Sequence, residues 1–475
     1  MVVVTADDPN IHSSQNEQDN RYYALFANIP CLEPSNPQEA KDMLLNGFEI
    51  SEKLELPLLF RLVTRVAHSR GPVILNPIIE RKKIGSFVKD AKRFVPLPAH
   101  ARVLHKALLE KVQMAKEISE KSPFNIVHRN GDGKIGIVSS GVSYNYVMEA
   151  INLLRLGTSI LKLGLVHPLP DRLIVDFLRG LESVVVVEEL EPFLELQLKT
   201  ICYDHGLRLP IWGKSQGHFP RFGEYSTRIV LSALSSILGK PSPIDYEKID
   251  TLATSAGKMA PARPPVLCPG CPHAATLYAI KVATSGRGVY PTDIGCYTLG
   301  VDPPLQVGDA LLCMGSSAGI ANGLSMVIDT PIVAVVGDST FFHASIPGLI
   351  NAVYNGHKFV YVILDNLTTA MTGFQPHPGT GVRADGKSSE RVIIEEVAKG
   401  CGVKFVEVVD PYDLKQTIST IKRAVQHDGP SVVVARRSCA SLSRMREKTP
   451  PYKILPELCR FKSSEVDGKT HKICL

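Results

Sequence analysis

The sequence lacks any uninterrupted apolar stretch long enough to span a bilayer, although 44% of its 475 residues are hydrophobic. It also has little excess charge, because 53 basic and 47 acidic side chains leave a formal net charge of +6. The basic excess gathers after Val434 without interleaved aromatic residues, which is typical of a solvated tail rather than of a nucleic-acid site. We therefore expect a soluble globular protein that binds no nucleic acid and no membrane.

A secretory signal peptide is not evident either, since residues 1–5 lead at once into a polar stretch. Ten cysteines are scattered through the chain, a usage typical of a reducing compartment. Both features predict a cytoplasmic protein. At 475 residues the chain is long enough for two or three domains with good cores.

Two apolar runs in the second half of the chain each end in oxygen-bearing side chains. Residues 332–336 are followed by Asp338, and residues 359–364 by Asn366. Residues 344–354 between them have helical spacing, so the runs are expected to be neighbouring parallel strands. Ligands bind at the carboxyl ends of such strands, and oxygen ligands suit a Mg²⁺ ion that also holds a diphosphate. The plainer alternative is a βαβ unit whose polar strand ends only cap the next elements.

The spacing of Asp338 and Asn366 is similar to the thiamine diphosphate signature, in which Gly-Asp-Gly is followed after one crossover helix by Asn. Ser339 stands where the signature has its last glycine. The resemblance implies that Mg²⁺ is bound by the Asp338 carboxylate, the Asn366 amide and the backbone carbonyl of Thr368. The diphosphate contacts that it implies are Gly337, Ser339 and Thr340.

Further motifs narrow the resemblance. Cys-Pro-Gly-Cys-Pro-His occupies residues 268–273, and Asp-Ile-Gly-Cys-Tyr-Thr occupies residues 293–298. Together with residues 315–319, 337–343 and 368–375, these motifs resemble the thiamine diphosphate-dependent 2-oxoacid:ferredoxin oxidoreductases. Within that family the similarity is greatest to the large (alpha) subunits of the indolepyruvate type.

The resemblance also implies roles for residues around the first cysteine motif. Cys271 and His273 would border the reactive side of the cofactor, where a thiol and an imidazole can orient a 2-oxoacid carboxylate, and they are the catalytic candidates. Gly315 would cradle the aminopyrimidine, although a tightly packed helix start explains this glycine nearly as well. The other cofactor contacts implied are Gly295, Cys296, Ser316, Ala370 and Met371.

Two other interpretations of residues 268–273 stay open. C-x-x-C with a nearby histidine has the spacing of zinc ligands, and Cys296 could complete a tetrahedral set. Alternatively, the proline and glycine set a structural turn in which the thiols pack as small hydrophobes.

The expected fold class is α/β, with several doubly wound parallel-sheet domains. From Lys134 onward, strand and helix patterns alternate as in a parallel sheet. Glu188, Glu189 and Glu191 at the end of one such strand are expected to be solvated. By resemblance, the chain divides into a partial pyrimidine-binding domain (1–85), a linker (86–124), a transketolase carboxyl-terminal-like domain (125–245), a thiamine diphosphate-binding domain (253–440) and a tail that is a degenerate start of a ferredoxin-like domain (441–475).

Some parts of the family pattern are not found in the sequence. The glutamate that activates the cofactor comes from the first half of the pyrimidine-binding domain, so we expect a fragment of a longer protein. Arg65 and His68, in the half that is present, are weaker candidates for substrate or domain contacts. The [4Fe-4S] clusters expected for the family have no ligand set in this chain, because the tail keeps only Cys459 and Cys474, which are too few.

The function implied by the resemblance is oxidative decarboxylation of an arylpyruvate to an acyl-CoA, with ferredoxin as electron acceptor. The implied partners are the small (beta) subunit, ferredoxin, the arylpyruvate and coenzyme A, in a dimer or heteromer. Two alternatives share the cofactor site: a non-oxidative decarboxylase or carboligase, and a truncated non-catalytic cofactor-binding subunit. The side chain of the oxoacid cannot be read from these motifs.

Overall fold

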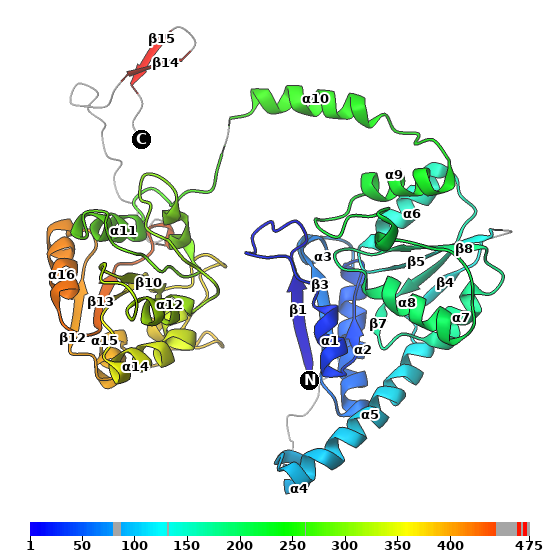
Figure 1. Ribbon diagram of the computed structural model, residues 1–475, viewed down its shortest axis with the longest axis horizontal. Helices are drawn as coiled ribbons and strands as arrows, with labels where there is room; N and C mark the ends of the chain where they lie inside the picture. Colours follow the sequence, from blue (N-terminus) through cyan, green and yellow to red (C-terminus); the bar gives the residue numbers. More distant parts are fainter. Residues whose placement is uncertain (79–86, 131–132, 262, 443–462, 467–468, 473–475) are drawn as a thin grey trace. The chain divides into compact units, whose positions relative to one another are not determined.

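The computed structural model describes residues 1–78, 87–130, 133–261, 263–442, 463–466 and 469–472. The chain forms two compact units, Met1–Met259 and Ala260–Leu475, and each is described by itself (Figure 1). Within the described residues, no helix has both the length and the apolar character needed to cross a membrane. Cys459 and Cys474, the tail cysteines considered above, lie outside the described residues.

The first unit contains two sheets. One has the order β1-β3-β2-β7, in which β1, β3 and β2 are parallel and β7 is antiparallel to β2. The other has the order β4-β6-β5-β8-β9, parallel except for the edge strand β4. The strands are β1 Val2–Asp7, β2 Cys31–Leu32, β3 Leu58–Val63, β4 Ile126–His128, β5 Ile135–Ser140, β6 Ser159–Leu163, β7 Leu165–His167, β8 Ser183–Val187 and β9 Ile211–Trp212.

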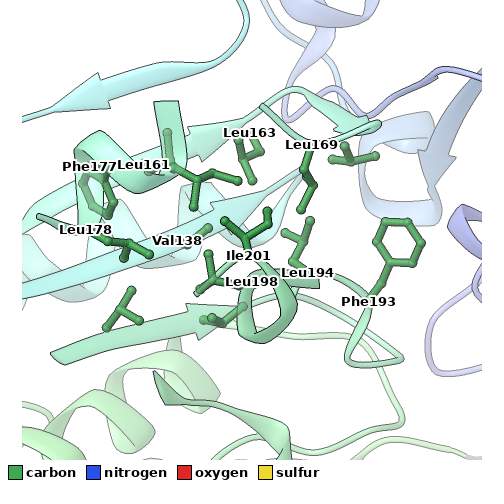
Figure 2. Packing of buried hydrophobic residues seen from close by; sticks show 14 of the residues in the cluster. Val138, Leu161, Leu163, Leu169, Phe177, Leu178, Phe193, Leu194, Leu198 and Ile201 are labelled. Carbon is green, nitrogen blue, oxygen red and sulfur yellow. The ribbon is translucent and has the colours of Figure 1, made fainter. Parts of the chain in front are cut away.

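Helices cover both faces of the five-stranded sheet, because alternate strand residues point to opposite faces. Val184 and Val186 belong to a core with α7 and α8, whose side chains meet those of β5 and β6 in Figure 2. Val185 and Val187 belong to a second core with α6 and α9. The helices of this unit are α1 Arg21–Ala27, α2 Pro37–Leu54, α3 Thr64–His68, α4 Ala91–Phe94, α5 Pro98–Glu120, α6 Ser143–Leu154, α7 Asp171–Leu178, α8 Phe193–Asp204, α9 Thr227–Leu238 and α10 Tyr246–Met259.

The start of α2 illustrates why these helices begin where they do. The Asn36 side chain accepts a hydrogen bond from the backbone N–H of Glu39 at 3.0 Å, and Pro37 occupies the first turn. The Glu39 carboxylate in turn accepts from the backbone N–H of Ser35 at 2.9 Å. These bonds satisfy N–H groups that have no partner inside the helix.

The expectation that Glu188 and Glu189 are solvated is wrong. Glu188 is 1% exposed and accepts a hydrogen bond from Arg21 Nη1 at 2.8 Å. Glu189 is 5% exposed, and burial raises its pKa to about 7. Only Glu191, which pairs with Arg221 at the surface, matches the prediction. The end of β8 is buried because the Arg21 guanidinium, from a distant part of the chain, offsets the free-energy cost of burying the Glu188 carboxylate.

The second unit contains a fully parallel sheet of order β10-β11-β13-β12 and an antiparallel pair of strands, β14 Ser463–Val466 and β15 Lys469–Lys472. Figure 1 shows α11 and α16 on one face of the parallel sheet and α12, α14 and α15 on the other. The strands are β10 Val333–Gly337, β11 Val360–Asp365, β12 Phe405–Val409 and β13 Ser431–Arg436. The helices are α11 Pro272–Ala283, α12 Ser316–Leu324, α13 Asp338–Thr340, α14 Ile346–Asn355, α15 Ile394–Gly400 and α16 Leu414–Gln426. The predicted α/β class with doubly wound parallel sheets is therefore confirmed.

Candidate cofactor and metal site

The two predicted strand tips are neighbours. β10 and β11 pair in parallel, with Gly337 beside Leu364, so Asp338 and Asn366 emerge at the same edge of the sheet. The oxygen of the Asn366 amide lies 3.2 Å from Asp338 Oδ2 and 2.5 Å from the carbonyl oxygen of Thr368. The structure thus brings together the three predicted metal ligands, all of which are at most 5% exposed.

Three converging oxygens repel one another unless something between them is positive. Turning the amide over would let its NH₂ group donate to both neighbours. A divalent cation would instead be coordinated by a carboxylate, an amide oxygen and a backbone carbonyl, which is the donor chemistry that Mg²⁺ prefers. The residues present therefore fit a magnesium ion, and metal binding itself stays a prediction.

A helix begins at the same edge. Asp338–Thr340 (α13), the π-helical turn Phe341–Ser345 (η3) and Ile346–Asn355 (α14) follow one another without a break. The N–H groups of the first turn have no partner within the helix, and the helix dipole favours negative charge there. Ser339 and Thr340 lie in this turn, as a diphosphate-binding role requires.

Gly337 is held against Tyr297, a residue that the sequence analysis did not single out. The Gly337 N–H donates to the Tyr297 hydroxyl at 2.8 Å, and that hydroxyl donates to the Ile294 carbonyl at 3.1 Å. A Cβ atom at Gly337 would lie 3.1 Å from the ring of Tyr297. Gly337 therefore permits the end of β10 to approach the Tyr297 ring closely. This contact joins the 293–298 motif to the start of α13.

One cleft at this edge collects most of the predicted cofactor residues. It is lined by the three predicted metal ligands and by His273, Gly295, Cys296, Gly337, Ser339, Thr340, Ala370 and Met371. Further lining residues, which were not predicted, include Tyr297, Met314, Thr369 and Thr372. Cys271, Gly315 and Ser316 are not among its lining residues.

The residues outside the cleft have local partners. Gly315 has φ +87° and donates its N–H to Asp293 Oδ2 at 2.8 Å, while a Cβ atom there would lie 2.6 Å from Ala344 Cβ. The packed helix start considered for Gly315 thus accounts for the glycine, and contact with a pyrimidine ring stays a prediction. The Ser316 hydroxyl accepts from the backbone N–H of Cys313 at 3.2 Å. In the first unit, Arg65 Nε donates to Glu224 at 2.7 Å, while His68 ends the short helix α3.

His273 lies in the wall of the cleft as a neutral imidazole. Burial lowers its pKa to about 4, opposed by the nearby charge of Asp338. Its ring meets the Tyr297 ring edge to face at 5.6 Å. Among the described residues, its Nδ1 has no hydrogen-bond partner. A buried ring nitrogen without a partner at the edge of a cleft is available to a bound molecule.

Four cysteines surround a second pocket that adjoins the cleft. Cys268, Cys271, Cys296 and Cys439 line this pocket, which shares His273, Cys296, Asn366 and Ala370 with the cleft. Burial raises the pKa of the Cys271 and Cys296 thiols. The sequence analysis missed Cys439, since it follows β13 and has no motif around it.

The zinc interpretation of residues 268–273 is not supported. In the described part of the chain, no three His, Cys, Asp or Glu side chains converge closely enough to share one metal ion. The structural turn is present, with the Cys271 N–H donating to the Cys268 carbonyl at 3.0 Å and Gly270 at φ +69°. Four thiols nevertheless line one cavity, although no set of cluster ligands was expected in this chain.

Two family models match parts of this chain. Residues 293–435 match the family model "Thiamine pyrophosphate enzyme, C-terminal TPP binding domain", and residues 125–245 match "Indolepyruvate oxidoreductase domain". The first match covers the predicted metal ligands and the helix start. It supports thiamine diphosphate as the cofactor.

Curated relatives match nearly the whole chain. Indolepyruvate oxidoreductase subunit IorA of Thermococcus kodakarensis is 46% identical over 483 residues, covering 96% of this chain and 74% of the relative. The IorA subunit of Archaeoglobus fulgidus is 48% identical over 451 residues, covering 94% of this chain and 71% of the relative. The IorA subunit of Pyrococcus abyssi is 46% identical over 484 residues, covering 97% of this chain and 74% of the relative.

Proposed function

Because the chain belongs to the family of indolepyruvate oxidoreductase IorA subunits, we propose that it catalyses oxidative decarboxylation of an arylpyruvate of the indolepyruvate type. The reaction depends on thiamine diphosphate and Mg²⁺. The product is an acyl-CoA, and the electrons leave to ferredoxin. The chain works with a small (beta) subunit, since its relatives are named as subunits of an oxidoreductase.

The observation that carries this proposal is the convergence of the Asp338 carboxylate, the Asn366 amide and the Thr368 carbonyl beside a helix start. Asp338, Asn366 and the Thr368 carbonyl would hold Mg²⁺, and the first helical turn at Ser339 and Thr340 would bind the diphosphate. When bound, thiamine diphosphate supplies a nucleophilic carbon and an electron sink for the decarboxylation of a 2-oxoacid.

The side chains of the cleft have separate tasks. Neutral His273 can donate or accept one hydrogen bond through Nδ1 and so can orient a substrate carboxylate without adding a charge. For Cys271 we propose a role other than the one first expected, because it lines the neighbouring four-thiol pocket and not the cleft.

We further propose that the four-thiol pocket holds a [4Fe-4S] cluster through Cys268, Cys271, Cys296 and Cys439. An oxidative decarboxylase needs an electron carrier close to its cofactor, and this pocket shares four residues with the cleft. The carrier would therefore not depend on tail cysteines. Such a site favours the oxidative reaction over the non-oxidative decarboxylase or carboligase.

A cytoplasmic location is part of the proposal. All eight cysteines of the described residues are free thiols, as expected in a reducing compartment.

The test uses the chain purified without oxygen, with and without its small subunit. Calorimetric titration measures binding of thiamine diphosphate with Mg²⁺, and carbon dioxide release from indolepyruvate is then followed in the presence of coenzyme A and a one-electron acceptor dye. We expect carbon dioxide and reduced dye together. Carbon dioxide with unreduced dye would indicate the non-oxidative alternative, and cofactor binding with no turnover in either preparation would indicate the non-catalytic one.

A further inference from the structure

His377 lies beside the predicted metal site, on the loop that follows β11. Its Nε2 is 3.1 Å from Asp338 Oδ2, and the two side chains are 3% and 5% exposed. A histidine this close to a buried carboxylate either shares its proton or holds the carboxylate in place. Which of these it does depends on the tautomer and on what fixes the ring.

A hydrogen bond to the other ring nitrogen determines the tautomer. The backbone N–H of Gly379 donates to His377 Nδ1 at 3.2 Å, so Nδ1 is an acceptor. In a neutral imidazole the proton is then on Nε2, the nitrogen that faces Asp338. The ring nitrogen that carries the proton is therefore the one that lies 3.1 Å from Oδ2, although it has no aligned hydrogen-bond partner among the described residues.

The ring is fixed from two further sides. It stacks at a tilt of 33° against Phe342, with ring centroids 5.9 Å apart. A Cβ atom at Gly379 would lie 3.0 Å from Phe342 Cε2 and 3.1 Å from His377 Cε1, so a side chain there would push the imidazole away. Arg391 Nε holds the Gly379 carbonyl at 2.8 Å. The loop is thus built to keep the imidazole at one distance from Asp338.

The Asp338 carboxylate has a different partner on each oxygen. Oδ1 accepts from the backbone N–H of Ser339 at 2.8 Å. Oδ2 faces the imidazole and the Asn366 amide. Because no aligned hydrogen bond from His377 occupies Oδ2 in the described residues, this oxygen keeps its lone pairs for a cation.

We propose that His377 is a positioning residue that orients Asp338 for Mg²⁺, an inference that rests on the metal site of the proposed function. Without the imidazole 3.1 Å from Oδ2, the carboxylate keeps the Ser339 bond on Oδ1 and can rotate away from Asn366 and Thr368. Loss of such an outer partner typically weakens metal binding by about 10- to 100-fold. His377 contacts the ligand and not the substrate, so its effect is on metal affinity first.

The test measures Mg²⁺ binding by calorimetry on the full chain at saturating thiamine diphosphate. We expect His377→Ala to raise the Kd for Mg²⁺ by about 10- to 100-fold. His377→Gln should recover part of the affinity, because its amide NH₂ can replace the Nε2 donor. His357→Ala is the matched control, since His357 is a half-buried histidine of the same unit that bonds to Asn322 at 2.6 Å, and its Kd for Mg²⁺ should equal that of the wild type.

Gly379→Ala covers the case in which His377→Ala does not fold. This substitution retains the His377 imidazole but moves it relative to Asp338, so the Kd for Mg²⁺ should again rise. Equal Mg²⁺ affinity in wild type, His377→Ala and Gly379→Ala, with only a lower melting temperature in the variants, would overturn the inference and leave a purely structural role. If the wild type binds neither Mg²⁺ nor thiamine diphosphate, the proposed function fails, and the inference fails with it.

Discussion

The backbone N–H of Cys439 donates to the carbonyl oxygen of Asn366 at 3.1 Å. This bond joins the chain after β13 to the chain after β11, and it places a thiol next to a predicted metal ligand. The four-thiol pocket and the cofactor cleft therefore share a wall. Electron transfer between groups in these two sites would need no rearrangement of the sheet.

Cys439→Ser should remove the proposed cluster and keep the cofactor site. The serine side chain has similar size but lacks the thiolate that a cluster requires. We expect loss of the broad visible absorbance and of acid-labile sulfide from protein purified without oxygen, with thiamine diphosphate affinity unchanged.

Cys313→Ser is the control for that variant, because Cys313 is an exposed thiol outside the pocket. If Cys439→Ser and the wild type contain equal iron and sulfide, the cluster is not in this pocket.

Asp338→Asn should abolish cofactor binding that depends on Mg²⁺. The substitution keeps the shape and removes the only formal charge among the three predicted ligands, so the loss should be about 100-fold or greater, above the range for outer partners. Calorimetric titration of Mg²⁺ at saturating thiamine diphosphate measures it. Asp329→Asn, at an exposed position of the same unit, should bind as the wild type does, and equal affinities in the two variants would exclude Asp338 as a ligand.

Tyr297→Phe should destabilise the second unit. Its hydroxyl is the acceptor for the half-buried Gly337 N–H, and since an unsatisfied buried donor costs about 1–3 kcal/mol, we expect the lower end of that range. Scanning calorimetry should show a lower melting temperature for the transition of this unit. Tyr203→Phe, at a residue that is 86% exposed, should leave both transitions unchanged.

The sequence predicts those parts of the fold and site that depend on local pattern. β10 and β11 are apolar runs of strand length, and residues between them have helical spacing, so adjacency of their tips follows from the parallel βαβ rule. Asp338 and Asn366 could be paired for this reason. The role of Thr368 as a metal ligand could be predicted only from the family resemblance.

The residues that could not be predicted depend on contacts between distant segments. His377 reaches Asp338 through an irregular loop, and no periodicity marks such a position. Cys439 joins the first cysteine motif only after the sheet has formed. Glu188 was expected to be solvated, because nothing near it in the sequence indicates that Arg21 would be its partner.

Glu188→Gln should strongly destabilise the first unit. Removing one charge of a buried pair leaves the other insufficiently compensated, which typically costs about 3–5 kcal/mol. Here Arg21 also bonds to Asp19 at 2.8 Å, so the lower end of that range is expected. The chain's single tryptophan, Trp212, lies in this unit, so its fluorescence reports unfolding by urea. Glu182→Gln, which breaks a surface pair with Lys134, should leave the midpoint unchanged.

Acidification should destabilise the first unit through His167. Burial lowers the pKa of His167 to about 4, from a usual value of 6.5. The unfolded chain therefore binds a proton below pH 6.5 that the folded chain does not take up until about pH 4. The stability contribution is complete above pH 6.5 and is lost as the pH falls through this window, by up to about 3 kcal/mol.

The comparison with His167→Asn isolates this effect. Glu189 has the opposite dependence, since its pKa is raised to about 7 and its contribution is lost as the pH rises from 4.5. That dependence is present in both proteins and cancels in their difference. Urea unfolding followed by Trp212 fluorescence should show the stability advantage of the wild type over His167→Asn shrinking between pH 7 and pH 4.5. A constant difference across that range would mean that His167 binds its proton equally well in the folded and unfolded chains, so that its burial does not disfavour the charged ring.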